Sequence, residues 1–454
     1  MRAAANRTGA STWLPGRQIE TGTLMIELEI ESLDREGRGI ARADGKTVFV
    51  DGAITGERVE CSVYKKKPSY EMAQVHSVLR ASAARVSPGC AYFGMCGGCS
   101  MQHVDARAQV AAKQRVLEDC LERIGKVKPG VVLSPIHGAP WHYRRRARLG
   151  VRLVRKKGGV LVGFHEKRSS FVADMQSCEV LPEPVSRALP ELRSLVARLS
   201  ICERMPQIEV SAGDSQTVLV FRVLDQPTDG DLDLLRAYAA SSGFQIWLQA
   251  SGPESAQQLC PMDAPPLEYR LPEFDLRLGF GPTEFTQVNH DVNRMLVRRV
   301  MRLLDPLPGE LVADMFCGLG NFSLPIARSG ARVLGVEGSA GLVARAGANA
   351  SKNGLQDLCR FEAANLFKAE SCAALGRFDK MLIDPPREGA IELVKSLEGR
   401  QPGRLVYVSC DPATLARDAE ILVHVLGYRL SAAGVVNMFP HTSHVESLAL
   451  FDMP

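Results

Sequence analysis

The chain lacks any long hydrophobic run. Within its 454 residues no apolar stretch approaches the roughly 18 residues that a membrane-spanning helix requires. The first 23 residues also lack the apolar core of a signal peptide, and their Ala, Thr, Arg and Gly content predicts a disordered tail over residues 1–23. We therefore expect a cytoplasmic protein with no membrane partner.

The chain also has little net charge and few aromatic residues. Its net charge of +4, 6% aromatic content and 45% hydrophobic content are typical of a globular enzyme with about three domains. The charge is unevenly spread, because residues 141–170 hold ten Lys or Arg and a single acid, Glu166. Such a run either forms a solvated surface or attracts a polyanion such as nucleic acid.

Residues 24–84 show short segments in which apolar and polar side chains alternate. Two of these segments flank Asp44-Gly45, a dipeptide typical of a hairpin turn. The pattern predicts a small OB-like β-barrel. The strand spacing and the Gly37-Arg38-Gly39 segment resemble the TRAM domain, which implies RNA binding; a structural barrel without a ligand is the alternative.

Residues 85–284 predict a central α+β domain. A helical pattern over about 103–125 ends at Gly125, and we expect this helix to pack on the catalytic domain. Strand patterns follow at 147–164 and 207–223, and Pro and Gly gather at 252–282.

Residues 285–454 alternate between strand and helix patterns. The predicted helices include 341–353 and 413–426, and this alternation predicts a doubly wound α/β sheet, a Rossmann-like domain. The predicted strands cover 311–316, 331–337, 360–364, 380–384, 405–409 and 447–451.

The first loop of that domain lacks one glycine of a dinucleotide-binding loop. Asp314 ends a strand, Gly318 and Gly320 allow a ligand to approach the backbone, but Ser323 stands where a third glycine would face a pyrophosphate. Glu337, at the end of the next strand, is placed to accept hydrogen bonds from a ribose diol. An acid ahead of a shortened glycine loop, with Glu337 at the second strand end, resembles the Rossmann-like methyltransferases. This resemblance implies S-adenosylmethionine, which has no pyrophosphate.

Asp384-Pro385-Pro386 lacks the aromatic residue that amine methyltransferases place next, since Arg387 follows. An amine needs no activating thiol, whereas carbon 5 of uracil does. Cys410, at the end of a predicted strand, is the candidate nucleophile that adds to carbon 6. Glu446 is the candidate base that removes the carbon-5 proton. An inert strand cysteine and an exposed carboxylate are the alternatives.

Five ordered motifs resemble the RNA uracil-C5 methyltransferases, and the resemblance covers nearly all of the chain after residue 24. They are Phe285–Asn289, Asp314–Asn321, Asp384–Arg387, Val408–Thr414 and Met438–Glu446. The resemblance implies Cys410 as nucleophile and Glu446 as base. The residues that it implies for the S-adenosylmethionine and substrate pocket are Gln287, Phe316, Asn321, Glu337, Asn365 and Asp384. Asp411 and Pro386 depart from the family's usual Asn and Ala without removing a reactive group.

Twelve cysteines in a cytoplasmic chain argue against disulfides. Cys90, Cys96 and Cys99 lie on a glycine-rich segment and Cys178 is a separate fourth, an arrangement that suits zinc or an iron–sulfur cluster. Resemblance to the cluster-bearing branch of the family implies a 4Fe-4S cluster at these four residues.

A chain that has both the barrel and the cluster resembles one branch of the family, the enzymes that methylate 23S ribosomal RNA at the uracil-1939 class of position. The implied partner is 23S rRNA or a precursor ribosomal particle, bound by a monomer. Another rRNA uridine or a tRNA is the alternative substrate, and an RNA-binding module without turnover is the alternative class of protein.

Overall fold

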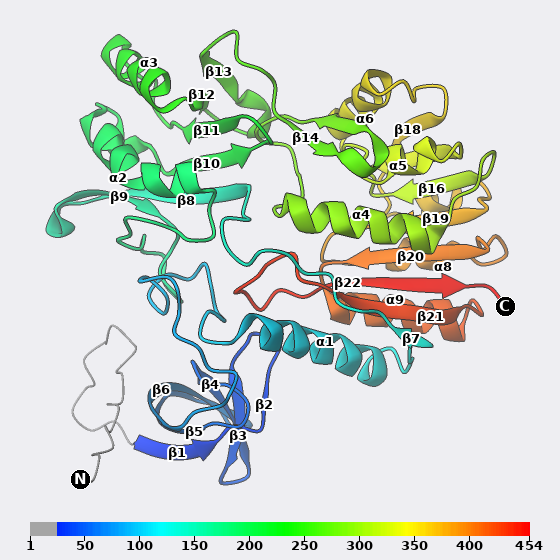
Figure 1. Cartoon of the computed structure of the whole chain (residues 1–454), viewed down its shortest axis with the longest axis horizontal. Coiled ribbons are helices and arrows are strands. Elements are labelled where there is room, and N and C mark those ends of the chain that lie inside the picture. The colour runs from blue at the N-terminus through cyan, green and yellow to red at the C-terminus, as the bar shows by residue number, and fades with distance from the viewer. Residues whose placement is uncertain (1–24) are drawn as a thin grey trace, which may run out of the picture. The chain divides into compact units, whose positions relative to one another are not determined.

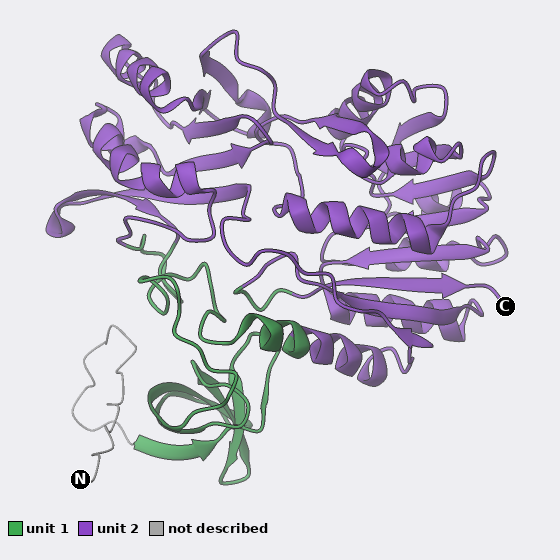
Figure 2. Cartoon of the chain, in the orientation of Figure 1, with its two compact units in different colours: residues 1–112, 165–173, 441–444 green, residues 113–164, 174–440, 445–454 purple. Residues whose placement is uncertain are grey.

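The computed structural model describes residues 25–454, so the tail predicted for residues 1–23 lies outside the described residues. The chain divides into two compact units (Figure 2). The described part of unit 1 comprises 25–112, 165–173 and 441–444, and unit 2 comprises 113–164, 174–440 and 445–454. Segments far apart in the sequence therefore meet within unit 1. The domain boundaries placed after residues 84 and 284 stay a prediction.

Unit 1 contains a six-stranded barrel-like sheet in the order β1-β5-β6-β4-β3-β2 (Figure 1). Asp44 and Gly45 both have positive φ, 49° and 76°, as a tight hairpin between β3 and β4 requires. Val48 and Val50 of β4 are fully buried, which accounts for the alternating pattern. The strands are β1 (Met25–Glu29), β2 (Ser32–Leu33), β3 (Gly39–Ala43), β4 (Lys46–Asp51), β5 (Arg58–Lys66) and β6 (Tyr70–Arg80).

The rest of unit 1 is held by backbone hydrogen bonds between loops. Lys167 N donates to Met95 O at 2.7 Å, and Gly97 N donates to His165 O at 2.8 Å. His441 O accepts from two successive amides, Ser100 N and Met101 N, each at 2.9 Å. These bonds satisfy backbone groups of a loop without regular secondary structure.

Unit 2 begins with a six-stranded sheet in the order β13-β12-β11-β10-β8-β9. Helix α2 (Glu183–Arg198) contacts β9, and α3 (Asp229–Ser242) contacts β12. The strands are β8 (Arg146–Val154), β9 (Gly159–Gly163), β10 (Gln207–Ala212), β11 (Thr217–Arg222), β12 (Gln245–Gln249) and β13 (Gln257–Cys260), and a separate hairpin pairs β14 (Glu268–Leu271) with β15 (Leu276–Gly279).

The second large sheet of unit 2 has the order β18-β17-β16-β19-β20-β22-β21-β7 (Figure 1). The strands from β18 to β20 are parallel, and β22 returns antiparallel between β20 and β21. This is the predicted doubly wound sheet. The strands are β16 (Leu311–Met315), β17 (Arg332–Glu337), β18 (Cys359–Ala363), β19 (Lys380–Ile383), β20 (Arg404–Ser409), β21 (Arg429–Val436), β22 (Glu446–Asp452) and β7 (Val131–Val132).

Helices cover both faces of this sheet. Val406 and Val408 of β20 face a core that includes α4 (His290–Leu304), whereas Leu405 and Tyr407 face one that includes α9 (Pro412–His424). Strands buried on both faces are apolar at nearly every position, which explains the short hydrophobic runs. The other helices are α1 (Ala106–Arg123), α5 (Ser323–Arg328), α6 (Ala340–Lys352), α7 (Ala369–Ala373) and α8 (Ile391–Lys395). Among residues 25–454, no helix is both long and apolar enough to span a membrane.

Candidate functional site

The candidate reactive residues gather at one edge of the eight-stranded sheet. Parallel strands end there, so the loop after β16, Asp384 after β19 and Cys410 after β20 all belong to this edge. Strand β22 runs the opposite way, so its first residue, Glu446, lies at the same edge. Residues up to 130 positions apart in the sequence are thereby brought to one place.

The glycine loop after β16 has the backbone geometry of a ligand-binding loop. Phe316, Gly318 and Gly320 have positive φ of 64°, 56° and 93°. A side chain at Gly320 would put its Cβ 2.4 Å from Leu324 Cδ1, so both backbone and packing require glycine there. The Glu337 carboxylate accepts from Gly318 N at 3.2 Å and thereby ties the loop to the end of β17.

Asp314 is the buried acid beneath this loop. Ser323 Oγ donates to Asp314 Oδ2 at 2.5 Å, and Oδ1 has no hydrogen-bond partner among the described residues. Burial raises the pKa of Asp314 to about 7, and the nearby Glu337 carboxylate adds to the rise. Ser323, which replaces a third glycine, thus anchors the acid at the start of α5.

Two of the predicted pocket residues have their side chains engaged within the protein. Asn321 and Asn293 exchange amide hydrogen bonds at 2.9 and 3.0 Å, and the Tyr269 hydroxyl donates to Asn321 Oδ1 at 2.8 Å. Asn365 is exposed, and its Oδ1 accepts from Phe367 N at 3.0 Å. Asn321 therefore shapes the glycine loop, while Asn365 shapes the loop after β18.

Aromatic side chains flank the same loop. The rings of Phe316 and Phe367 lie 5.6 Å apart between centroids, at 53° to each other. Phe316 is half-buried and Phe367 is exposed, and Gln287 is half-buried just before α4. Partly exposed aromatic faces beside a glycine loop suit an adenine ring.

The ladder between β20 and β22 brings the thiol and the carboxylate together. Ser409 pairs with Ser447, so Cys410 and Glu446 occupy the next positions at the end of the ladder. Cys410 is half-buried, and burial together with Glu446 and Asp384 raises the pKa of its thiol to about 12. Arg387 lowers that pKa and is the cation that favours the thiolate.

Glu446 is 7% exposed, and burial raises its pKa to about 7. Lys113 and Arg387 act in the opposite direction. Burial and Glu446 raise the pKa of Asp384 well above its usual value. A carboxyl group that titrates near neutral pH is suited to general base catalysis.

Sequence reasoning missed two cations of this site. Arg387 was predicted as a member of the Asp384–Arg387 motif and as a non-aromatic residue but was given no role, although its place directly after Asp384-Pro385-Pro386 indicates the same sheet edge. Lys113 lies on α1, far from every motif in the sequence, and no local pattern marks it.

The cysteines that were predicted to hold a cluster are divided between the units. Cys90, Cys96 and Cys99 belong to unit 1 and Cys178 to unit 2. Cys90, Cys96 and Cys178 are buried, and Gly98 N donates to Cys96 Sγ at 3.4 Å. Within residues 25–454, no group of three or more His, Cys, Asp or Glu side chains has the geometry of a metal site.

The basic run between residues 141 and 170 is divided between the two units. In unit 2 the Arg148 guanidinium pairs with Glu209 at 3.2 Å, and in unit 1 Lys167 and Arg168 pair with Asp51 at 2.9 and 2.8 Å. Three cations, Arg155 to Lys157, are exposed in the short turn between β8 and β9. Charges that are adjacent in sequence are therefore partly used for internal ion pairs.

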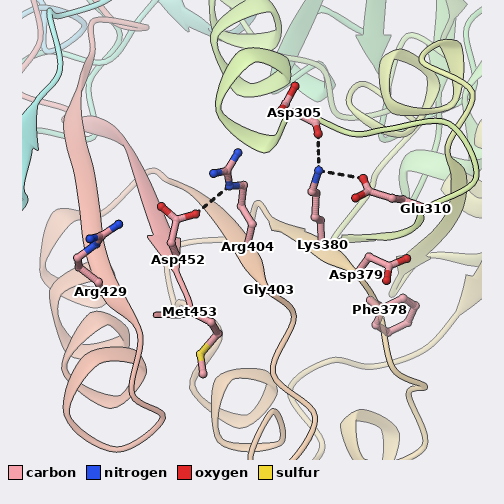
Figure 3. Close-up of a pocket in the computed structure, with 10 residues that line it drawn as sticks. All are labelled: Asp305, Glu310, Phe378, Asp379, Lys380, Gly403, Arg404, Arg429, Asp452 and Met453. Atoms are coloured by element: carbon pink, nitrogen blue, oxygen red, sulfur yellow. Dashed lines mark hydrogen bonds and ion pairs between the residues drawn. The ribbon is translucent and has the colours of Figure 1, made fainter.

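A pocket of about 750 Å³ lies at the opposite edge of the eight-stranded sheet (Figure 3). Lys380 and Arg404, which begin β19 and β20, line it. Lys380 pairs with Glu310 at 2.9 Å and Arg404 with Asp452 at 2.8 Å (Figure 3). Since its charged groups pair with one another and the reactive residues lie at the other edge, this pocket is not the candidate active site.

Comparison with known families gives two matches. The family model described as tRNA (Uracil-5-)-methyltransferase matches residues 105–453, and the TRAM domain model matches residues 25–75. The second match confirms the prediction for the N-terminal barrel.

Curated relatives are similar over nearly their whole length. The chain is 61% identical to the 23S rRNA (uracil(1939)-C(5))-methyltransferase RlmD of Aromatoleum aromaticum, over 93% of this chain and 98% of that relative. It is 62% identical to the protein of the same name from Thiobacillus denitrificans, over 94% of this chain and 99% of that relative.

A solved structure shares the fold. The crystal structure of Pyrococcus abyssi tRNA (uracil-54, C5)-methyltransferase in complex with S-adenosyl-L-homocysteine matches with a TM-score of 0.72 and 24% identity. The match covers 94% of this chain and 100% of that one.

Proposed function

The chain belongs to the tRNA (uracil-5-)-methyltransferase family, and we propose that it methylates carbon 5 of a uridine in 23S ribosomal RNA, the uracil-1939 position named for its relatives. One observation carries the chemistry: the ladder between β20 and β22 places the Cys410 thiol beside the buried Glu446 carboxylate. The ribosomal substrate rests on relatives that are 61% and 62% identical.

Two residues of the site, Cys410 and Glu446, take part in the bond changes of this reaction. S-adenosylmethionine, when bound, supplies an electrophilic methyl group. Cys410 adds to carbon 6 of the uracil as a thiolate, which makes carbon 5 nucleophilic toward that methyl group. Glu446 then accepts the carbon-5 proton, and the bond between Cys410 and carbon 6 breaks. The uridine must leave its base stack to reach Cys410, at a cost of a few kcal/mol.

The glycine loop and its neighbours form the proposed donor pocket. Phe316 offers a ring face, Glu337 a carboxylate for the ribose diol, and Gly318 and Gly320 an open backbone. Asn321 acts through the shape of the loop, because its amide is bonded to Asn293 and Tyr269. Gln287, Asn365 and Asp384 complete the proposed set.

Mapping of methylated uridines tests this function. After incubation of the protein and S-adenosylmethionine with 23S rRNA, with precursor particles and with tRNA, we expect 5-methyluridine at one position of the 23S rRNA. Methylation confined to tRNA, or to another rRNA uridine, would overturn the substrate and keep the chemistry. RNA binding without methylation would leave only a binding module.

We also propose that Cys90, Cys96, Cys99 and Cys178 hold a 4Fe-4S cluster. Four thiolates are a suitable ligand set, and the Gly98 N–H bond to Cys96 Sγ is of the kind that stabilises cluster sulfurs. Gly97 allows close packing, since a Cβ there would lie 3.2 Å from His165 O. The methylation steps require no electron transfer, so the cluster would have a structural role.

Iron analysis tests the cluster. Anaerobically purified protein is expected to contain about four iron and four sulfide ions per chain and to show visible absorbance that bleaches on reduction. Replacement of Cys96 by Ser should remove most of the iron, while Cys202→Ser, outside the set, should retain it. Stoichiometric zinc without iron would contradict the proposal.

The exposed turn between β8 and β9 is proposed to contact RNA phosphates. Replacement of Arg155, Lys156 and Lys157 by Ala should weaken RNA binding and reduce the slope of log affinity against log salt by about 2, because each phosphate contact contributes about 0.7. Filter binding at several salt concentrations measures this slope. Arg236→Ala on α3, an exposed arginine paired with Asp233, should leave it unchanged. An unaltered slope in the triple variant would exclude this turn from the RNA interface.

A further inference from the structure

Lys113 is a buried cation on α1. Its side chain is 2% exposed, and its ammonium donates to Asn437 Oδ1 at 2.7 Å and to Phe439 O at 2.8 Å. A lysine is rarely buried to this degree without a compensating negative charge. Two neutral oxygens accept two of the three hydrogen bonds that an ammonium can donate, and they do not balance its charge.

Glu446 is the acid that acts electrostatically on Lys113. Strands β21 and β22 pair Val436 with Glu446, and Asn437 directly follows Val436, so the segment that accepts hydrogen bonds from the ammonium begins one residue after the strand partner of Glu446. The ammonium lowers the pKa of Glu446, which burial raises to about 7. Glu446 in turn raises the pKa of Lys113, which burial lowers to about 7. Each group therefore favours the charged form of the other.

Three further groups face Glu446 from the loops after β19 and β20. Arg387 is a second cation that lowers its pKa, whereas Asp384 and Cys410 each have a pKa that Glu446 helps to raise. Arg387 acts on both Cys410 and Glu446. Lys113, by contrast, affects the pKa of Glu446 and of no other described group whose pKa is shifted.

We propose that Lys113 is a positioning residue for the base: its ammonium keeps Glu446 ionised and, through Asn437 and Phe439, holds the segment that precedes β22. The proposal rests on the proposed function, in which Glu446 removes the carbon-5 proton. In that step the bond between carbon 5 and hydrogen breaks, and its electron pair forms the double bond to carbon 6. The electrons of the bond between carbon 6 and sulfur return to Cys410, and the proton goes to Glu446.

Lys113→Gln separates charge from hydrogen bonding, because the amide group can donate to the same oxygens without a positive charge. Loss of the ammonium raises the pKa of Glu446, so less carboxylate is present at pH 7. We expect the pH midpoint of adduct breakdown to rise by about one unit from about 7, which makes breakdown about fivefold slower at pH 7 and lets it recover at higher pH. Single-turnover assays that follow the release of methylated RNA from the protein measure this midpoint.

Lys395→Gln is the matched control, since it makes the same substitution at an exposed lysine of α8 that pairs with Glu392. Its pH midpoint should equal that of the unmodified protein. A Lys113→Gln protein that is slower at every pH with an unchanged midpoint would overturn the proposal, as would an equal shift in Lys395→Gln. Unmodified protein that forms neither adduct nor 5-methyluridine would instead refute the proposed function itself.

A second measurement does not depend on how Lys113→Gln folds. Electrostatic coupling is reciprocal, so removal of the Glu446 charge must lower the pKa of Lys113 as much as removal of Lys113 raises that of Glu446. NMR titration of lysine labelled with carbon-13 at Cε, in the unmodified protein and in Glu446→Gln, reports this value. A lower Lys113 midpoint in the variant is expected, and identical midpoints would overturn the proposal.

Discussion

Replacement of Cys410 by Ala is expected to reduce methylation of 23S rRNA by a factor on the order of 10⁴ to 10⁶. Without the sulfur, carbon 5 of uracil is too weak a nucleophile to attack the methyl group. The other described thiol that follows a strand at this edge, Cys317 after β16, is buried, and burial raises the pKa of its thiol, so it does not replace Cys410. Transfer of labelled methyl groups to rRNA measures the loss. Calorimetry should show that the variant still binds S-adenosylmethionine as the unmodified protein does.

Cys359→Ala provides the matched control. Cys359 is also half-buried and belongs to the same sheet, on β18, so its loss tests for general damage to the domain. It should keep nearly full activity. A Cys410→Ala protein with more than about a tenth of the normal rate would mean that the thiol does not carry the reaction.

Replacement of Glu446 by Gln is expected to trap the RNA on the protein. Glutamine fills the same space but cannot accept the carbon-5 proton, so methyl transfer proceeds while release slows by about 10² to 10⁴. A denaturing gel should show a covalent complex of protein and RNA that carries the labelled methyl group. The double variant with Cys410→Ala should form no such complex.

The buried carboxylate also predicts how Glu446→Gln affects stability. The pKa of Glu446 is about 7 in the folded protein, above its ordinary value of 4.5. The folded state therefore loses stability as the pH rises from the ordinary pKa to about 7, because the buried carboxyl group must then lose its proton. The Gln variant lacks this penalty and should melt at a higher temperature at pH 8 than the unmodified protein. Rapid release of methylated RNA from a well-folded variant would assign the proton to another base.

Much of the catalytic edge could be predicted from short patterns. Asp314, Asp384 and Cys410 each lie at or directly after the end of an apolar run, and such runs are easily recognised when both faces of a sheet are buried. The predicted double winding and the N-terminal barrel were confirmed for the same reason.

Other features depend on tertiary contacts and left no local pattern. Strand β21 was not predicted because its centre, Ser431 to Gly434, consists of small residues that interrupt the apolar run. The roles of Arg145 to Arg148 could not be separated, since Glu209, which pairs with Arg146 and Arg148, comes from β10. Lys113 was missed because its partners follow more than 300 residues later.

The ladder between β20 and β22 has a consequence for how this chain tolerates change. Six consecutive residue pairs, from Arg404 with Asp452 to Ser409 with Ser447, define the distance between the thiol and the carboxylate. That distance does not depend on the length of the connection through residues 411–445. Insertions at its exposed turn around Gly427 should therefore leave the reaction geometry intact, whereas a shift of β22 by a single residue would turn Glu446 toward the opposite face of the sheet.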